Sequence, residues 1–214
     1  MSVSRTDTTA ARAARADARK NATRTRLLEA GRRLFALKGP RDVTSHEIAA
    51  EAGFASGTFY LHFKDKHALF AELADVAAAE LERRIATVFA NKTDPVDILH
   101  GHADALIGFA EEHRDLIRIL FRPDAEVGVQ AERILQRLAD GLVSRRRERM
   151  AEHEAEDGFE TEVLAQAVVG MWSRVLIWWA EDPSRADRED VMRTLIQFHL
   201  HGSGGSPTDP RGAA

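Results

Sequence analysis

Cysteine is absent from this chain of 214 residues. Without it there is no disulfide, no thiolate metal ligand and no thiol nucleophile. A reducing compartment is compatible with such a composition, and residues 1–26 contain no apolar segment of the kind that forms a secretory signal. We therefore expect a cytoplasmic protein.

Sequence motifs for catalysis are also missing. There is no glycine-rich phosphate loop, no nucleophile elbow, and no pair of carboxylates that differs from an ordinary solvated helix face. We expect neither enzyme activity nor a cofactor. A metal-responsive protein stays open as an alternative because histidines gather at His100, His102, His113, His199 and His201. An i, i+2 spacing points side chains to diverging faces of a helix, so we expect no metal site.

Strand-like patterning is scarce as well, since no stretch shows sustained period-two alternation with β-branched residues. The sequence therefore predicts an all-α fold. The predicted helices cover about residues 23–38, 44–53, 56–63, 65–90, 95–113, 115–121, 124–150, 160–180 and 185–201. Pro95, Pro123 and Pro183 lie at or near helix starts, where a missing N–H is harmless.

One apolar run, Val163–Ala180, nearly reaches the length that spans a membrane. It contains Gln166, Ser173 and Arg174, which are costly in lipid. We interpret the run as a buried helix and expect no membrane association.

Charge is distributed unevenly along the chain. Residues 1–41 contain eleven Lys or Arg and three Asp or Glu, and residues 1–66 have a net charge of +6. The whole chain has a net charge of −4, which leaves −10 on the remainder. A basic head on an acidic body indicates a polyanionic partner at one end only. Residues 1–20 are predicted to form a flexible basic arm, and residues 202–214, rich in Gly, Ser and Pro, a disordered tail.

The segment Thr44–Lys66 has the pattern of a helix-turn-helix, two short helices joined by a turn that contains glycine. Thr44 and Glu47 have capping-box spacing at the start of the first helix. Small residues keep that helix thin enough for the second to cross it closely: Ala49, Ala52 and Gly53. A small core is expected from Ile48, Phe54, Phe59 and Phe63.

The start of the second helix is slim and polar. Its tip consists of Ala55, Ser56, Gly57 and Thr58. Such a tip fits a major groove, which is about 12 Å wide. Tyr60, His62 and Lys66 follow as donors suited to phosphate oxygens.

This segment resembles the DNA-binding domain of the TetR family, the tetracycline-repressor-like regulators. The matching residues are Ile48, Ala49, Ala52, Gly53, Gly57, Thr58, Tyr60, His62, Phe63, Lys66 and Leu69. The resemblance covers about residues 24–73, and the remainder agrees with the family only in length and helical character. It implies a DNA-binding domain over residues 21–66 and a helical effector-binding and dimerisation domain over residues 67–201.

The resemblance also implies roles for single positions. Thr44 would bind phosphate, with Ser45 beside it, and His46 stands where the family often has a base-reading side chain. Base edges and nearby phosphate would meet Ala55, Ser56, Gly57 and Thr58. Phosphate would be bound by Tyr60, His62 and Lys66, the last at the start of a helix whose dipole favours an anion. Phe54 departs from the family, in which a smaller aliphatic residue is usual.

Each of these roles has a simpler alternative. Tyr60 could be part of the core, and His46 and His62 could be surface histidines without a function. Because Ala55 and Gly57 offer no side-chain donor, sequence readout falls on few residues or on DNA shape. The basic arm could enter the minor groove or only add nonspecific attraction.

In the remainder of the chain we expect a cavity between the middle helices and a two-fold dimer of helices. The cavity candidates are Leu106, Phe109, Ile117, Leu120, Phe121, Val169 and Trp172, with plain core packing as the alternative for each. Arg174 could bind an anionic head group of the ligand, or it could form an ion pair with a carboxylate side chain. The dimer candidates are Leu164, Val168, Val175, Trp179, Leu195 and Phe198. Residues 145–149 are interpreted as an exposed, charged helix face.

The sequence thus predicts a DNA-binding transcriptional regulator, cytoplasmic and associated with the nucleoid when bound. A homodimer would bind a pseudo-palindromic operator with half-sites about 34–36 Å apart. A small, largely apolar or aromatic ligand would release it by preferring a different conformation. Repression is the family default, and a ligand-independent DNA-binding protein is the main alternative.

Overall fold

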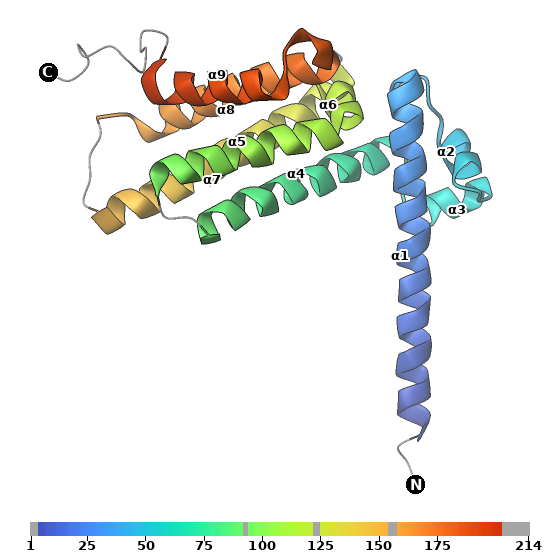
Figure 1. The fold of residues 1–214 in the computed structure, drawn as a ribbon. Coiled ribbons are helices and arrows are strands. Elements are labelled where there is room, and N and C mark those ends of the chain that lie inside the picture. Colours follow the sequence, from blue (N-terminus) through green and yellow to red (C-terminus); the bar gives the residue numbers. More distant parts are fainter. Residues whose placement is uncertain (1–3, 92–93, 122–124, 154–157, 203–214) are drawn as a thin grey trace, which may run out of the picture. The chain divides into compact units, whose positions relative to one another are not determined.

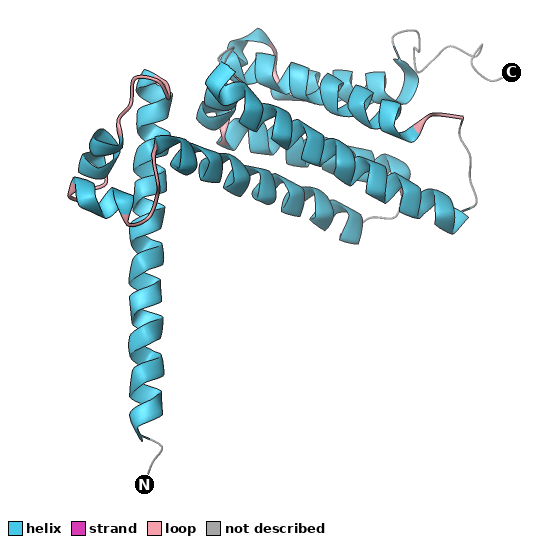
Figure 2. Ribbon diagram, turned by 180° about the vertical axis from the view of Figure 1, so that it is seen from behind, coloured by secondary structure: helices cyan, strands magenta, loops and turns pink. Residues whose placement is uncertain are grey.

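A computed structural model describes residues 4–91, 94–121, 125–153 and 158–202 (Figure 1). The described residues form helices and no strand, so the predicted all-α fold is confirmed (Figure 2). The chain divides into two compact units, Met1–Leu73 and Ala74–Ala214. The predicted tail lies almost wholly outside the described residues, as does Pro123.

The first unit contains α1 (Ser4–Lys38), α2 (Ser45–Glu51), α3 (Ser56–Tyr60) and the start of α4 (Lys66–Asn91). Its core includes Leu27, Ile48, Phe59 and Leu69, all with no exposed surface. A Cβ placed on Gly31 would lie 2.5 Å from Leu69 Cδ2. Glycine at that position therefore lets α1 pack closely on the first turn of α4.

Helix α1 begins at Ser4, whereas the sequence pattern predicted a start near Thr23. The reason is intrinsic propensity, because residues 4–22 contain many Ala and Arg and neither Gly nor Pro. The predicted start was based on apolar periodicity alone, and an exposed helix does not need an apolar stripe. The described side chains of residues 12–20 are exposed, and the flexibility of the arm stays a prediction.

The second unit holds the rest of α4 and the remaining helices, α5 (Pro95–Glu112), α6 (Arg114–Leu120), α7 (Ala125–His153), α8 (Thr161–Glu181) and α9 (Arg188–His201). Helix α8 packs on α6 and α7, and α5 packs on α9. A 3₁₀ turn at Pro183–Arg185 precedes α9, which therefore begins three residues later than expected. Asp65, Asp94 and Glu160 each accept a backbone N–H at a helix start.

Helix α8 is long and apolar enough to span a membrane, judged by length and composition alone. Only 28% of its apolar window is buried in the protomer, although it packs on α6 and α7 as a bundle helix does. An apolar helix with so much exposed surface has a face that is free for another partner.

Two leucines in the first unit test how its core is packed. Leu69→Ala leaves a cavity between α1 and α4, and we expect the free energy of unfolding to fall by about 2–5 kcal/mol. The matched control is Leu61→Ala, because Leu61 is 79% exposed; it should change stability by less than about 0.5 kcal/mol. Thermal and urea unfolding measure both, and equal effects would contradict the packing described.

Candidate DNA-binding surface and effector cavity

A capping box fixes the start of α2, as the sequence predicted. The Thr44 hydroxyl accepts a hydrogen bond from the Glu47 N–H (3.2 Å), and Glu47 Oε2 accepts one from the Thr44 N–H (2.9 Å). Hydrogen bonds from Lys38 and from Thr44 lower the pKa of Glu47 to about 2. Glu47 is therefore ionised at neutral pH, which suits a carboxylate in the first turn of a helix.

A glycine and an arginine shape the turn between α2 and α3. Gly53 has φ +75°, a left-handed conformation that glycine adopts without strain. The Phe54 N–H donates to the Ala49 carbonyl (2.8 Å), and Arg26 Nη2 donates to the Ala52 carbonyl (2.7 Å). Phe54 was expected in the core, but its ring is partly exposed and lies beneath the Arg26 guanidinium, 4.6 Å from it. That cation–π contact accounts for a large ring at a position near the surface.

Helix α3 separates its core side from a polar outer side. Phe59 is fully buried, whereas the next residue, Tyr60, is 54% exposed. The other predicted DNA-binding residues of this region are exposed at Thr44, His46, Ala55 and Gly57 and half-buried at Ser45, Ser56 and Thr58. His46 Nδ1 lies 2.7 Å from Ser56 Oγ, so the two helices are joined by a polar contact on this surface. We call residues 44–46, 55–58 and 60 the α2–α3 face.

Gly57 is not required by the protein's own packing. It lies inside α3, where glycine is a weak helix former, and a Cβ added there would meet no atom within 4 Å. The space above Gly57 is thus open. Such a position allows a partner to approach the backbone closely.

His62 and Lys66 are less free than the other predicted phosphate ligands. Burial, and then the charges of Arg24 and Lys20, lower the pKa of His62, and its Nδ1 is buried without a hydrogen-bond partner. The Lys66 ammonium donates to the carbonyls of Pro40 and Arg41, both at 2.8 Å. Lys66 therefore fastens the loop before α2, and one of its three N–H groups remains for a phosphate.

A largely apolar cavity of about 260 Å³ lies in the second unit. Seven predicted residues line it, namely Leu106, Phe109, Ile117, Leu120, Phe121, Val169 and Trp172. Arg174 does not, because it lies on the exposed side of α8. Whether these residues bind a ligand stays a prediction.

The sequence interpretation missed the polar part of the cavity. Arg145 and Arg149 line it, and Arg146 is only 8% exposed, so residues 145–149 are not simply an exposed face. The signal was present in the sequence, because Arg145 and Arg149 continue a stripe of cavity-lining leucines at alternating spacings of three and four: Leu135, Leu138 and Leu142. His102 likewise interrupts the apolar stripe of α5 and lines the cavity.

The structure corrects the predicted dimer candidates. Trp179 and Leu195 are buried within the protomer at 2% and 3% exposure. Trp179 Nε1 donates to the Ala186 carbonyl (2.8 Å), and the Arg114 guanidinium lies 5.1 Å from its ring. Leu164, Val168 and Val175 are half-buried, and Phe198 is exposed. Helix α8 is apolar on most sides, and sequence periodicity alone could not say which side faces the core.

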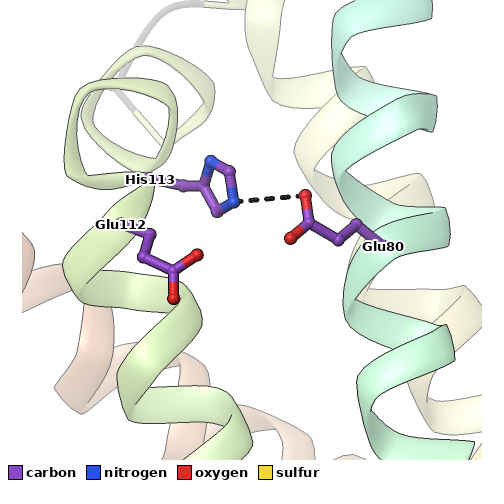
Figure 3. A group of neighbouring side chains, drawn as sticks. All are labelled: Glu80, Glu112 and His113. Atoms are coloured by element: carbon purple, nitrogen blue, oxygen red, sulfur yellow. Dashed lines mark ion pairs between the residues drawn. The ribbon is translucent and has the colours of Figure 1, made fainter.

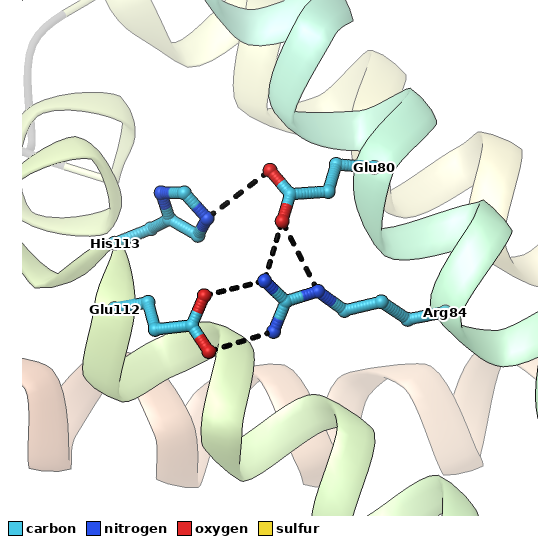
Figure 4. Close-up of polar contacts among 4 residues, drawn as sticks. All are labelled: Glu80, Arg84, Glu112 and His113. Carbon is cyan, nitrogen blue, oxygen red and sulfur yellow. Dashed lines mark hydrogen bonds and ion pairs between the residues drawn. The ribbon is translucent and has the colours of Figure 1, made fainter.

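Side chains of α4 and α5 form a polar cluster beside the cavity (Figure 3). Ligand-type atoms of Glu80, Glu112 and His113 lie within 4.8 Å of one another, and His113 Nε2 is 3.2 Å from Glu80 Oε2. Arg84, however, forms ion pairs with both glutamates (Figure 4). Its guanidinium already pairs with both carboxylates, so we interpret the cluster as a network that ties α4 to α5. Among the described residues, none of the other histidines considered for a metal joins it.

Comparison with known proteins agrees with this arrangement. Residues 27–73 match the family described as bacterial regulatory proteins, tetR family. An uncharacterised HTH-type transcriptional regulator of Bacillus subtilis, YdgC, is 28% identical over 182 residues, which cover 81% of this chain and 91% of the relative. The helix-turn-helix and these similarities define a transcriptional regulator that binds DNA, rather than an enzyme.

Solved structures show how far the fold extends. A TetR-family regulator from Syntrophomonas wolfei superposes with a TM-score of 0.75 at 17% identity, covering 88% of this chain and 99% of that one. FadR from Bacillus subtilis, solved in complex with stearoyl-CoA, has a TM-score of 0.67 at 20% identity and covers 83% of this chain and 98% of its own. At such identities the likeness concerns the fold. The family match covers residues 27–73, and the described helices beyond them share the fold of solved TetR-family regulators.

Proposed function

We propose that the protein is a homodimeric repressor that binds a pseudo-palindromic operator through the α2–α3 face and is released by a largely apolar effector. The observation that carries the proposal is the outward polar surface of α3, with open space at Gly57. The family match supports DNA binding and ligand response. The residues that contact the operator, and the repression of transcription that results, are our inference.

The surface chemistry of the first unit supports a DNA partner. Residues 1–66 carry a net charge of +6 on a chain that is acidic overall. The exposed groups at His46 and Tyr60 can donate to base edges or phosphates, and the bare backbone at Gly57 permits close approach. The logarithm of the affinity for duplex DNA should then fall linearly with the logarithm of salt concentration.

Gly57→Glu tests the DNA-binding face without disturbing the fold. The new side chain meets no protein atom near its Cβ, but its charge would face the phosphates, and we expect affinity for duplex DNA to fall by about tenfold or more. Gly128→Glu is the matched control, because Gly128 is an exposed helical glycine of the second unit with equally open surroundings. Fluorescence anisotropy at several salt concentrations measures both variants. Undiminished binding by the Gly57 variant would show that DNA meets another surface.

The exposed side of α8 and the end of α9 support a homodimer. Val163 is 67% exposed, and Ala167 and Gly170 follow on the same side of α8. On α9, Phe198 and Leu200 are 49% and 45% exposed. Exposed apolar residues on α8 and at the end of α9 suit a helical interface between two copies of the chain. Such a dimer would present two DNA-binding units to one operator.

Gly170→Arg tests this interface. A Cβ at Gly170 would meet no atom of the protomer within 4 Å, so the protomer should fold, while an arginine would block close approach of a second copy. We expect the wild-type protein to sediment as a dimer and the variant as a monomer. Gly128→Arg should remain dimeric. A dimeric Gly170 variant would remove this side of α8 from the interface.

The cavity of the second unit supports an apolar effector. Its walls are mostly aliphatic and aromatic, with Trp172 and Phe109 among them, and pockets of this character take small apolar ligands. The FadR structure in complex with stearoyl-CoA shows that a protein of this fold can take a ligand with a long apolar chain. Release from DNA would follow from linkage, because an effector weakens operator binding only by its differential affinity for the two conformations.

A further inference from the structure

Arg145 of α7 is a cation in the wall of an apolar cavity. Its side chain is half-buried, and its guanidinium lies 5.1 Å from the ring of Phe89. Nε is buried, and no described residue forms a hydrogen bond with it. Several other arginines of this unit, among them Arg84, Arg137 and Arg188, form ion pairs with carboxylates, whereas no described carboxylate forms one with Arg145.

A glycine lies beside this guanidinium. A Cβ added to Gly141, one turn earlier on α7, would lie 3.2 Å from Arg145 Nη1 and 3.3 Å from Nη2. The arginine therefore folds back over the bare backbone of the preceding turn, as helical side chains tend to do. A Cβ at Gly141 would make the guanidinium shift by a few tenths of an ångström, so the glycine leaves room for the side chain in this position.

The charge is incompletely compensated in this position. Burial lowers the pKa of Arg145, while the more distant charges of Glu148 and Glu82 act in the opposite direction. A guanidinium nevertheless stays protonated in proteins. A partly desolvated cation without a paired anion is costly, and a ligand that brings an anion would remove that cost.

The shape of the cavity indicates what else the ligand contains. Its lining on α4 runs from Ala77 to Phe89, about 18 Å along the helix at 1.5 Å per residue. Phe89 is the last of these residues, and its ring contacts both Arg145 and His102 (ring centroids 4.5 Å apart for the latter pair). Arg145 and His102 thus meet near one end of an elongated, largely apolar space.

We infer that the effector is an amphiphilic anion, an elongated apolar body with a carboxylate or phosphate that Arg145 binds beside Phe89. This inference rests on the proposed function, because it names the chemistry of the ligand that the cavity takes. The carboxylate or phosphate accepts N–H donors from the guanidinium, and the apolar body fills the space towards α6. Gly141 leaves room for the arginine in this position.

Three ligands of equal chain length test the inference, namely decanoate, decyl phosphate and decanol. Binding to the full chain is measured by calorimetry and by tryptophan fluorescence, to which Trp172 in the cavity wall contributes. We expect one of the anions to bind about tenfold or more tightly than the alcohol, since hydrogen bonds to charged groups are strong. The tighter anion identifies the head group.

Single-residue variants then test whether Arg145 causes the preference for an anion over the alcohol. Arg145→Gln should make the anion and the alcohol bind equally, and Gly141→Ala, which keeps the arginine and shifts its guanidinium by only a few tenths of an ångström, should lower the preference slightly. Arg147→Gln is the matched control, because Arg147 is exposed, pairs with Glu162 and does not line the cavity. Circular dichroism and melting temperature establish that each variant is folded.

The outcomes separate this inference from the proposed function. If the wild-type protein and Arg145→Gln both bind decanol and the anions equally, the cavity takes apolar ligands but the head-group inference is wrong. If Arg147→Gln loses the preference as fully as Arg145→Gln does, the anion binds elsewhere and the inference is again overturned. If none of the three ligands binds the wild-type protein, the apolar effector of the proposed function fails together with the inference.

Discussion

The α2–α3 face depends on the burial of one side of a very short helix. Phe59 is wholly enclosed in the core of the first unit, with Ile48 of α2 and Leu69 of α4 equally buried. Successive residues of a helix point in different directions, so fixing Phe59 inward turns Gly57 and Tyr60 outward. A five-residue helix has little stability of its own, and its orientation therefore comes from this packing.

The second unit combines an apolar interior with a few polar groups in defined places. The Arg84 network ties α4 to α5 through ion pairs with Glu80 and Glu112. Arg145, by contrast, faces the cavity without an ion pair among the described residues. Helix α4 begins in the first unit and continues as a wall of the cavity, so a ligand that shifts α4 has a direct covalent route to the DNA-binding unit. Linkage requires only that the effector binds one conformation of this helix more tightly than the other.

Local chemistry made much of the first unit predictable. The capping box at Thr44, the left-handed Gly53 and the inward Phe59 follow from short-range rules, and all three are present. The start of α1 was misplaced because an exposed Ala-rich and Arg-rich helix carries no apolar stripe. Phe54 was placed in the core because the contact that holds it, with Arg26, is distant in sequence.

The helices of the second unit were predictable from the sequence, but the side of each helix that packs in the core was less so. Seven cavity residues were found because apolar stripes on several helices converge. Trp179 was expected at the interface because α8 is apolar nearly all round, and periodicity does not distinguish its core side from its outer side; Leu195 of α9 is likewise buried within the protomer. Arg145 was overlooked because a run of arginines resembles a solvated face, although its spacing from Leu138 and Leu142 continued the lining stripe.

The single tyrosine of the chain provides the most direct measurement of the central claim, that the outer side of α3 meets DNA. Tyr60 is the only tyrosine, so protein labelled with 3-fluorotyrosine gives one fluorine resonance that reports on α3 alone. Titration with the operator duplex should shift or broaden that resonance in proportion to the DNA bound. A resonance that stays unchanged while the protein is saturated with duplex would contradict the account.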